Sequence, residues 1–212
     1  MYIPNLFRET DTDSLVAFMH QHSFATVVSI QDGAPVATHL PLTVHRHTDT
    51  ITLRGHFAKA NPQWRALAES ETLAIFTGPH AYISPKHYET RESVPTWNYL
   101  AVHAYGQAST VQLDDDAGEL TSMLSELIAA HEPSYQHQWD TLPERYRDGM
   151  LRGVVGFEMV VTRLEGKAKL SQNKNEREQK SITAALLTSE DPAAKATGEE
   201  MRRRREEAQE DT

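Results

Sequence analysis

Short apolar runs rich in β-branched and aromatic residues recur along the chain and predict an antiparallel sheet. The two runs between Phe24 and Val44 are separated by Asp32-Gly33, a dipeptide that tolerates the positive φ angles of a tight hairpin turn. Six runs have the length and composition of strands, at residues 24–31, 34–44, 51–56, 72–78, 101–113 and 154–166. We therefore expect a mainly β fold with flanking helices.

Helical patterns lie between and after these runs. A helix is expected at residues 12–22 and a short one at 61–70. The clearest pattern follows Asp116, which suits an N-cap, with Glu119 three residues later as a capping-box partner. From Lys174 onward the charged composition predicts further helix, so the C-terminal part should be helical.

The run Arg202–Arg205 has two interpretations, a nucleic-acid contact or a solvated helix. Acidic residues outnumber basic ones by eight to five between Glu190 and Thr212. Glu199, Glu200, Glu206 and Glu207 can form helical i,i+4 ion pairs with these arginines. The solvated helix is the better interpretation.

Residues 79–95 have no sustained period of either a helix or a strand, and they contain three prolines, two histidines and two tyrosines. Long irregular loops inside compact domains are uncommon and often functional. The aromatic content favours an ordered binding loop over disorder.

Composition limits the class of protein. The 212 residues suit one domain with a full core, or one domain and a small appendage. No apolar run approaches the roughly 18 to 20 residues of a membrane-spanning helix. The chain has no cysteine and its N-terminus has no signal-peptide pattern. A net charge of −9 argues against broad attraction to nucleic acid. We expect a cytoplasmic protein without a membrane partner.

Common enzyme motifs are missing, among them GxGxxG, GxxxxGK[ST], GxSxG and HExxH. The histidine pairs His20/His22 and His45/His47 raise the question of a metal site. Side chains two apart diverge on a helix, and the second pair has only Asp49 nearby. No metal is therefore expected.

The segment GHFAKANPQW, from Gly55 to Trp64, follows a strand and begins a helix. Such a position presents N–H groups to an anion, and Lys59 would add a charge. On spacing alone, an ordinary N-cap at Asn61 and a solvated Lys59 explain the segment better.

A second unusual segment, Val36–Val44, places His39 and Pro41 inside a strand. Proline removes a ladder donor and indicates an edge, a bulge or a place where another group lies against the backbone. A flat heteroaromatic ring is one such group, although a bulged edge strand is again the simpler reading.

Several motifs together resemble the PaiB family, the FMN-binding negative transcriptional regulators related to flavin split-barrel proteins. They occur in the same order from Met1 to about Leu187. The segments are MYIPNLF at the start, HLPL at His39–Leu42, GHFAKANPQW, TGPHAYISPKHY, PTWNY at Pro95–Tyr99 and KLSQNK at Lys169–Lys174.

The resemblance implies a six-stranded antiparallel FMN-binding split barrel at residues 1–170, with a C-terminal helical extension at residues 171–212. It also implies a homodimer that holds FMN at the subunit interface, with one strand along the flavin ring and the next strand and helix start around the phosphate. The residues it assigns to the cofactor are Thr38, His39, Leu40, Pro41, Arg54, Gly55, His56, Lys59 and Asn61, with Trp97 and Asn98 from the other subunit. GHFAKAN is a sparser phosphate grip than the related oxidases have, and KLSQNK either closes over the cofactor or only begins the last helices.

Three functions remain open. The resemblance implies a transcriptional regulator, a repressor, that senses redox state or a metabolite through bound flavin; DNA is a partner that the acidic charge supports only weakly. The alternative is a small FMN-dependent oxidoreductase or oxidase in which His39, His103 or Tyr82 orients a substrate. The third is an interaction domain that has lost the flavin.

Overall fold

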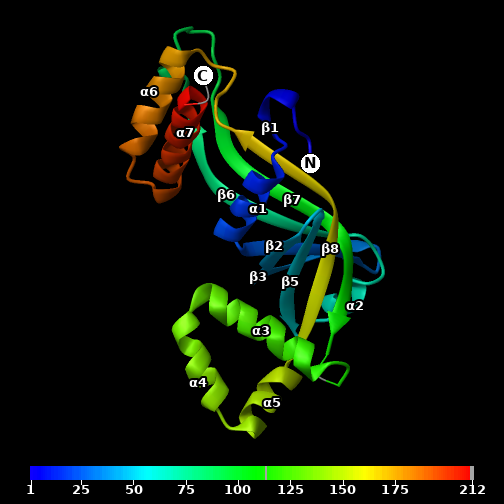
Figure 1. Cartoon of the computed structure of the whole chain (residues 1–212). Coiled ribbons are helices and arrows are strands. Elements are labelled where there is room, and N and C mark those ends of the chain that lie inside the picture. The colour runs from blue at the N-terminus through cyan, green and yellow to red at the C-terminus, as the bar shows by residue number, and fades with distance from the viewer. Residues whose placement is uncertain (113, 211–212) are drawn as a thin grey trace. The chain divides into compact units, whose positions relative to one another are not determined.

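The computed structural model describes residues 1–112 and 114–210. Its contacts group into two compact units, which are described separately. Unit 1 comprises Met1–Asp11, Thr77–Val102 and Glu165–Thr212, and unit 2 comprises Thr12–Phe76 and His103–Leu164. Three long strands have residues in both units (Figure 1).

The fold is mainly β with flanking helices, as the sequence predicts. Eight strands form one sheet, in the order β3-β2-β6-β7-β8-β5-β4, with β1 paired to β8. Among the described residues the order ends at β3 and β4, so the sheet does not close. The strands are β1 Arg8–Glu9, β2 Phe24–Gln31, β3 Ala34–Pro41, β4 Thr43–His47, β5 Thr50–Ala58, β6 Thr72–Ile83, β7 Thr96–Val111 and β8 Val154–Lys169.

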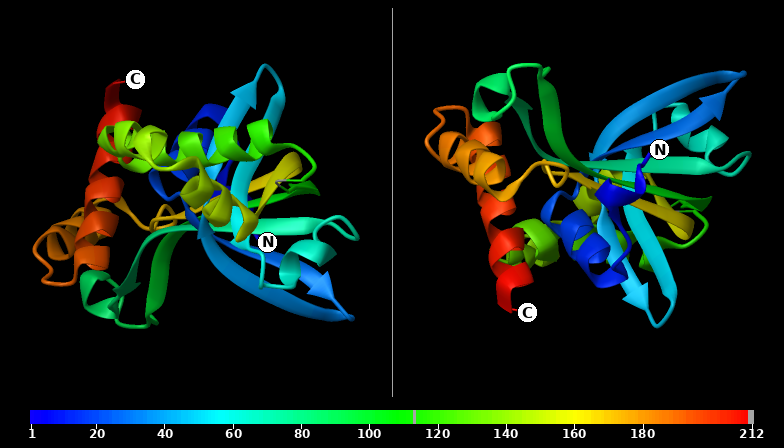
Figure 2. Two further views of the ribbon diagram at one scale, coloured as in Figure 1. Left: turned by 90° about the horizontal axis from the view of Figure 1, so that it is seen from below. Right: turned by 90° about the horizontal axis from the view of Figure 1, so that it is seen from above.

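The predicted count of six strands is too low because the run at residues 34–44 contains two strands. It pairs with β2 as far as Pro41, and the N–H of Leu42 still donates to the Ser23 carbonyl at 2.9 Å. From Thr43 the chain pairs with β5 instead, opposite Arg54. The polar stretch that follows is therefore part of a second hairpin, and Figure 2 shows the two hairpins as separate blue and light-blue ribbons. The two-residue β1 is the other addition.

The turn between β2 and β3 has the predicted form. Asp32 and Gly33 both have positive φ, 52° and 77°, and the strands pair in register from Gln31↔Ala34 to Phe24↔Pro41. An Asp-Gly turn with both residues in the left-handed region matches the twist of the flanking strands, so local sequence determines this register.

The helices of unit 2 cover a core of apolar strand residues. Phe57 and Phe157 lie on the same face of the neighbouring strands β5 and β8, with ring centroids 5.3 Å apart, and both side chains are buried. Asp116 caps α3 by accepting a hydrogen bond from the N–H of Glu119 at 2.9 Å, as the spacing predicts. The helices are α1 Thr12–Gln21, α2 Gln63–Ala66, α3 Ala117–His131, α4 Gln136–Thr141 and α5 Glu144–Arg152, with a short 3₁₀ turn, η3, at Pro133–Tyr135.

Unit 1 contains η1 Asn5–Phe7, η2 Pro85–His87 and two C-terminal helices, α6 Glu176–Leu187 and α7 Pro192–Glu210. Asn175 begins α6 with a capping box to Glu178, two residues later than the start considered at Asn173. The helices α6 and α7 lie side by side in Figures 1 and 2. Buried Ile182 and Met201 belong to the apolar core of this unit.

The arginine run on α7 is largely paired with carboxylates, as the solvated-helix interpretation predicts. Arg203 contacts Glu200 and Glu207 at 2.7 and 2.5 Å, and Arg204 contacts Glu200 and Glu9 at 2.6 and 2.8 Å. The pKa of Glu200 is lowered because, although burial opposes its charge, the two arginine hydrogen bonds outweigh that effect. This run is therefore engaged within unit 1.

The segment at residues 79–95 is shorter as a loop than the sequence pattern indicates. Strand β6 continues through Pro79 to Ile83, where Ala81 and Ile83 are buried, and β7 begins at Thr96. The irregular part is confined to residues 84–95, including η2.

The predicted division into a barrel at residues 1–170 and a helical extension at residues 171–212 stays a prediction. Asp211 and Thr212, the last residues of that extension, lie outside the described residues. So does Leu113, at the end of one predicted strand. No helix in the described part of the chain is long and apolar enough to cross a membrane.

Candidate functional site

The strand β3 presents polar and aromatic side chains at one end of the strand order in unit 2. His39 is exposed, Thr38 and Pro41 are half-buried, and Leu40 is buried. The exposed ring of Phe24 lies roughly parallel to that of His39, at 29° and 6.4 Å between centroids. Strand β3 ends the strand order, which is the edge position that Pro41 indicates. The rings of Phe24 and His39 are both accessible on one face of the hairpin.

The turn after β5 keeps Lys59 accessible. Its backbone N–H donates to Gly153 at 2.8 Å, and its carbonyl accepts from the Trp64 indole at 3.1 Å. The side chain is exposed, and no carboxylate among the described residues lies within ion-pair distance of its ammonium group. The backbone is therefore fixed while the charge remains available to an anion.

A hydrogen-bond network joins this turn to β3, so the structure brings the two segments that stood out in the sequence together. Asn61 Nδ2 donates to Thr38 Oγ1 at 2.8 Å, and Thr38 Oγ1 donates to Gln63 Oε1 at 2.5 Å. Asn61 Oδ1 accepts from the N–H of Gln63, the first residue of α2, at 3.0 Å. The N-cap position itself is Pro62, one residue later than the sequence predicts, and the amide of Asn61 supports the start of the helix from the preceding position.

Gln63 is the residue that sequence reasoning missed. It is buried, and its Nε2 donates to the carbonyls of Val27 and Val36 at 2.9 and 3.2 Å, one in each strand of the β2–β3 hairpin. A glutamine one position after Asn-Pro looks like an ordinary helix residue, and no local signal distinguishes it. It holds the hairpin in place beneath the candidate site.

Arg54 is surrounded by three carboxylates within unit 2. It contacts Glu158 at 2.7 Å, Glu119 at 3.0 Å and Glu126 at 3.1 Å, and the ring of His45 lies 3.1 Å from Glu126. Burial opposes its charge, but the hydrogen bond to Glu158 and the charges of all three glutamates raise the pKa of Arg54. A phosphate here would meet an excess of negative charge, which weighs against the phosphate-binding role expected for Arg54.

His56 is half-buried on β5, and burial lowers its pKa below the ordinary value. It is therefore neutral at neutral pH. A neutral imidazole still donates one hydrogen bond, so His56 suits a ligand as a donor rather than as a charge.

Gly55 has a packing reason of its own. A Cβ added there would lie 2.7 Å from Leu42 Cδ2 and 3.1 Å from both Leu40 and Phe157. The apolar core of unit 2 occupies the space of the missing side chain. Close approach of a ligand is therefore not needed to explain this glycine.

Trp97 and Asn98 lie in unit 1. The exposed indole of Trp97 has the rings of His80 and Tyr82 near it, at 5.7 and 6.2 Å between centroids. Asn98 is fully buried and bonded to Ser171, with Nδ2 donating to Oγ at 2.9 Å and Oγ lying 3.2 Å from Oδ1. Trp97 is open to a ligand or a second chain, whereas the amide of Asn98 is committed within the unit; a cofactor contact of either stays a prediction.

No group of three metal-ligating side chains gathers anywhere in the described ranges. His45 faces Glu126, as above, and His20 is exposed on α1.

Comparison with known proteins gives a family match over most of the chain. A family model described as "Putative FMN-binding domain" matches residues 1–163. The chain is 44% identical over 202 residues to "Protease synthase and sporulation protein PAI 2" of Bacillus subtilis, covering 95% of this chain and 96% of that protein. It is also 30% identical over 203 residues to an uncharacterised protein of Emericella nidulans, covering 81% of this chain and 80% of that protein.

Solved structures share the fold at low sequence identity. A flavocytochrome of Azotobacter vinelandii superposes with a TM-score of 0.58 at 14% identity, over 76% of this chain and 69% of that one. An FAD- and heme-binding protein of Mycobacterium smegmatis gives a TM-score of 0.58 at 18% identity, over 82% of this chain and 78% of that one. These likenesses concern the fold.

Proposed function

The chain belongs to the PaiB family of FMN-binding proteins, with FMN as cofactor, and from this membership we propose that it is a flavin-dependent negative regulator of gene expression. The observation that carries the proposal is the near full-length match to PAI 2. A match that spans both proteins relates whole chains rather than one shared module. The regulatory role rests on the description of the PaiB family as negative transcriptional regulators and comes to this chain as part of the proposal.

The side chains of β3 and of the turn after β5 fit FMN. The accessible ammonium group of Lys59 suits its phosphate, and a charge-assisted bond of this kind contributes about 1.5 to 3 kcal/mol. The exposed rings of His39 and Phe24 offer a flat surface to the isoalloxazine ring. When bound, FMN supplies one- and two-electron redox chemistry.

We assign different roles to the remaining expected cofactor residues. His56 donates a hydrogen bond as a neutral imidazole, and Leu40 with Pro41 forms the apolar backing of the strand. Thr38 and Asn61 hold the strand against the turn through their mutual hydrogen bond. Arg54 fixes α3 to β5 through its glutamates rather than holding phosphate.

The proposal includes a homodimer in which Trp97 reaches the flavin of the partner subunit. Trp97 and Tyr82 are 52% and 53% exposed, which supports a covered surface in the assembly, since large aromatic side chains are favoured at interfaces. Dilution to a monomeric state should release flavin. Light scattering shows whether the diluted protein is a monomer. If that monomer still retains flavin, the shared site is contradicted.

Regulation without a broad basic face fits the charge of the chain. The net charge is −9, and three of the four arginines of the run on α7 have carboxylate partners. We therefore expect the protein to regulate expression without binding its own promoter directly. In a gel-shift assay at low salt, the purified protein should not retard that DNA. Retardation at low salt that disappears as salt rises would establish direct DNA binding.

An absorption spectrum tests the cofactor assignment. The purified protein is mixed with excess FMN, unbound ligand is removed, and the flavin bands are measured; one FMN per subunit is expected. A colourless protein would favour the interaction-domain alternative. Steady turnover of NADH or NADPH by the loaded protein would favour the oxidoreductase alternative instead.

A further inference from the structure

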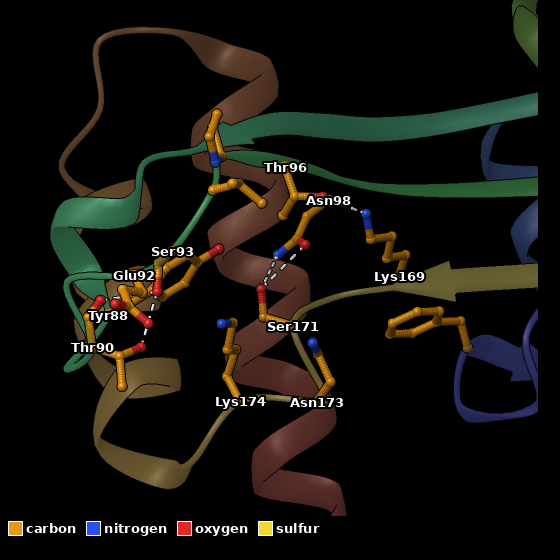
Figure 3. Close-up of a pocket in the computed structure, with 13 residues that line it drawn as sticks. Tyr88, Thr90, Glu92, Ser93, Thr96, Asn98, Lys169, Ser171, Asn173 and Lys174 are labelled. Atoms are coloured by element: carbon orange, nitrogen blue, oxygen red, sulfur yellow. Dashed lines mark hydrogen bonds between the residues drawn. The ribbon is translucent and has the colours of Figure 1, made fainter.

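A separate pocket lies entirely within unit 1. Its volume is about 490 Å³, in the range of small-molecule sites. Figure 3 shows the residues that line it, which come from η1, the loop before β7, β7 itself, the end of β8 and the turn that follows β8. They are Phe7, Tyr88, Thr90, Glu92, Ser93, Val94, Pro95, Thr96, Asn98, Lys169, Ser171, Asn173 and Lys174. Asn98 is one of the residues assigned to the cofactor, and Lys169 to Lys174 form the segment that closes over the cofactor in one of its two interpretations.

The turn at Ser171–Lys174 is held rigidly beside this pocket. Ser171 is 2% exposed and has a φ of 64°, a conformation that costs a non-glycine residue free energy. The buried amide of Asn98 bonds its hydroxyl, and the N–H of Lys174 donates to the Ser171 carbonyl at 3.0 Å. Gln172 donates back to Ala168 and accepts from the N–H of Leu170. The turn is therefore pre-organised before any ligand arrives.

Two half-buried cations face the pocket from the two ends of this segment. The ammonium group of Lys169 donates to Thr96 Oγ1, and that of Lys174 lies 3.6 Å from the ring centroid of Tyr88. In the described part of the chain neither has a carboxylate within 4.0 Å. Figure 3 shows both side chains turned toward the Asn98–Ser171 pair. A half-buried ammonium group without a counter-charge is costly unless an anion occupies the site.

Neutral donors surround these cations. The hydroxyl of Thr96 and the amide of Asn173 line the same pocket, which has Glu92 as its acidic lining residue. The hydroxyl of Ser171 is committed to Asn98 and supports the turn rather than the ligand. Burial, followed by the charge of Glu178, raises the pKa of Tyr88, so its hydroxyl keeps its proton and remains a donor. Two ammonium charges with neutral donors match the charge and the acceptors of a phosphate dianion.

We propose that this pocket binds a small phosphorylated metabolite, whose phosphate is held by Lys169 and Lys174, at a site separate from that of FMN. The binding does not rest on the regulatory function proposed above. If the protein is a regulator, the phosphorylated metabolite bound here would be one signal that it senses, and the flavin at its own site would be a second.

The first test measures the dissociation constant of inorganic phosphate for the FMN-loaded protein by ³¹P NMR titration at constant ionic strength. Lys169→Gln and Lys174→Gln should each weaken binding by about tenfold or more, the effect of losing one charge-assisted bond. Lys195→Gln is the matched control, because Lys195 is exposed on α7 of the same unit and does not line the pocket. Equal constants for the wild-type protein and the Lys169→Gln/Lys174→Gln double variant would overturn the proposal.

A second measurement needs no variant. Phosphate added to ¹⁵N-labelled protein should shift amide signals of residues 88–98 and 169–174, and shifts confined to other residues reject this pocket. Lys169→Arg and Lys174→Arg keep the charge and should retain binding within about threefold. Loss of binding in these variants while their melting temperatures are unchanged counts against a charge-based site.

The source of the phosphate is decided by competition. If the pocket is separate, saturating FMN leaves the phosphate titration unchanged, and the glutamine variants bind FMN as the wild-type protein does. If FMN displaces phosphate, and the variants lose FMN but keep riboflavin, the pocket holds the flavin phosphate and the separate site is rejected. The absorption test of the cofactor is independent of both results.

Discussion

Asn61 Nδ2 donates a hydrogen bond to Thr38 Oγ1 across 2.8 Å, and this contact ties the turn after β5 to the edge strand β3. Both residues resemble cofactor ligands in the sequence, yet their polar atoms hold the protein together. Through its Oδ1, the same amide accepts a hydrogen bond from the N–H of Gln63, the first residue of α2. The position of Lys59, two residues earlier, therefore depends on a contact that involves no ligand.

Asn61→Ala removes the hydrogen bond to the first N–H of α2 and the contact to β3. We expect the free energy of unfolding to fall by about 1 to 2 kcal/mol, the usual effect of losing two neutral hydrogen bonds. Urea denaturation measures this change, with Asn5→Ala as the control because Asn5 is exposed in η1. Unchanged stability with weakened FMN binding would return Asn61 to the role of a direct ligand.

Lys59→Ala tests the phosphate contact. FMN binding should weaken by about 1.5 to 3 kcal/mol if the ammonium group bonds the phosphate, whereas riboflavin, which has no phosphate, should bind equally to both proteins. Fluorescence titration gives both affinities, and Lys195→Ala serves as the control for loss of an exposed lysine charge. The same affinity of the Lys59→Ala variant for FMN rejects the contact.

Arg54→Met distinguishes a structural from a phosphate-binding arginine. Three glutamates would lose their common partner, so stability should fall by about 2 to 3 kcal/mol while FMN affinity changes little. Arg46→Met is the matched control, because Arg46 pairs only at the surface with Asp13 and should cost less than about 1 kcal/mol. A large loss of FMN affinity with normal stability is the opposite result and would restore Arg54 to the cofactor site.

Gly55→Ala places a methyl group in the core of unit 2. Because its Cβ would meet Leu42 at 2.7 Å, we expect a loss of about 1 to 3 kcal/mol in the free energy of unfolding from overpacking. Thermal and urea unfolding measure it. If the Gly55→Ala variant keeps its stability but binds FMN more weakly, Gly55 is needed for the close approach of the ligand instead.

The stability should depend on pH through His56. Burial lowers the pKa of His56 in the folded protein, so the unfolded chain takes up the proton first, at its ordinary pKa of about 6.5. The contribution is complete above that pH and is lost as the pH falls below it. His56→Gln should therefore lose less stability than the wild-type protein between about pH 7.5 and 5.5. Denaturation at a series of pH values measures both slopes, and an identical slope in the wild-type protein and in His56→Gln would contradict this account.

Local chemistry predicts those parts of the fold that neighbouring residues determine. Asp32-Gly33 forms its turn, Asp116 caps α3, and the arginines of α7 find glutamates one helical turn away. The helices α4 and α5 each bury a single residue, Trp139 and Leu151, so few core positions mark them in the sequence. The continuation of β6 past Pro79 likewise depends on burial of Ala81 and Ile83, which no local period reveals.

The structure joins the two segments that the sequence singles out, strand β3 and the turn after β5, through Thr38 and Asn61. Which of their side chains contact FMN stays a prediction. The carboxylate partners of Arg54 could not be predicted from local sequence, because Glu126 and Glu158 lie 72 and 104 positions away. Only the assembled sheet brings these charges to the guanidinium group.

The change of partner at Leu42 restricts how chains of this kind can vary in length. Leu40, Leu42 and Val44 are all buried, so the in-and-out alternation of side chains passes through Leu42 unbroken from one hairpin to the next. One inserted or deleted residue here would turn the apolar face of β3 or of β4 outward. The exposed turn at Thr48–Asp49 has no such constraint. Length differences among related proteins are therefore expected at Thr48–Asp49, while the spacing between Leu40 and Val44 is kept.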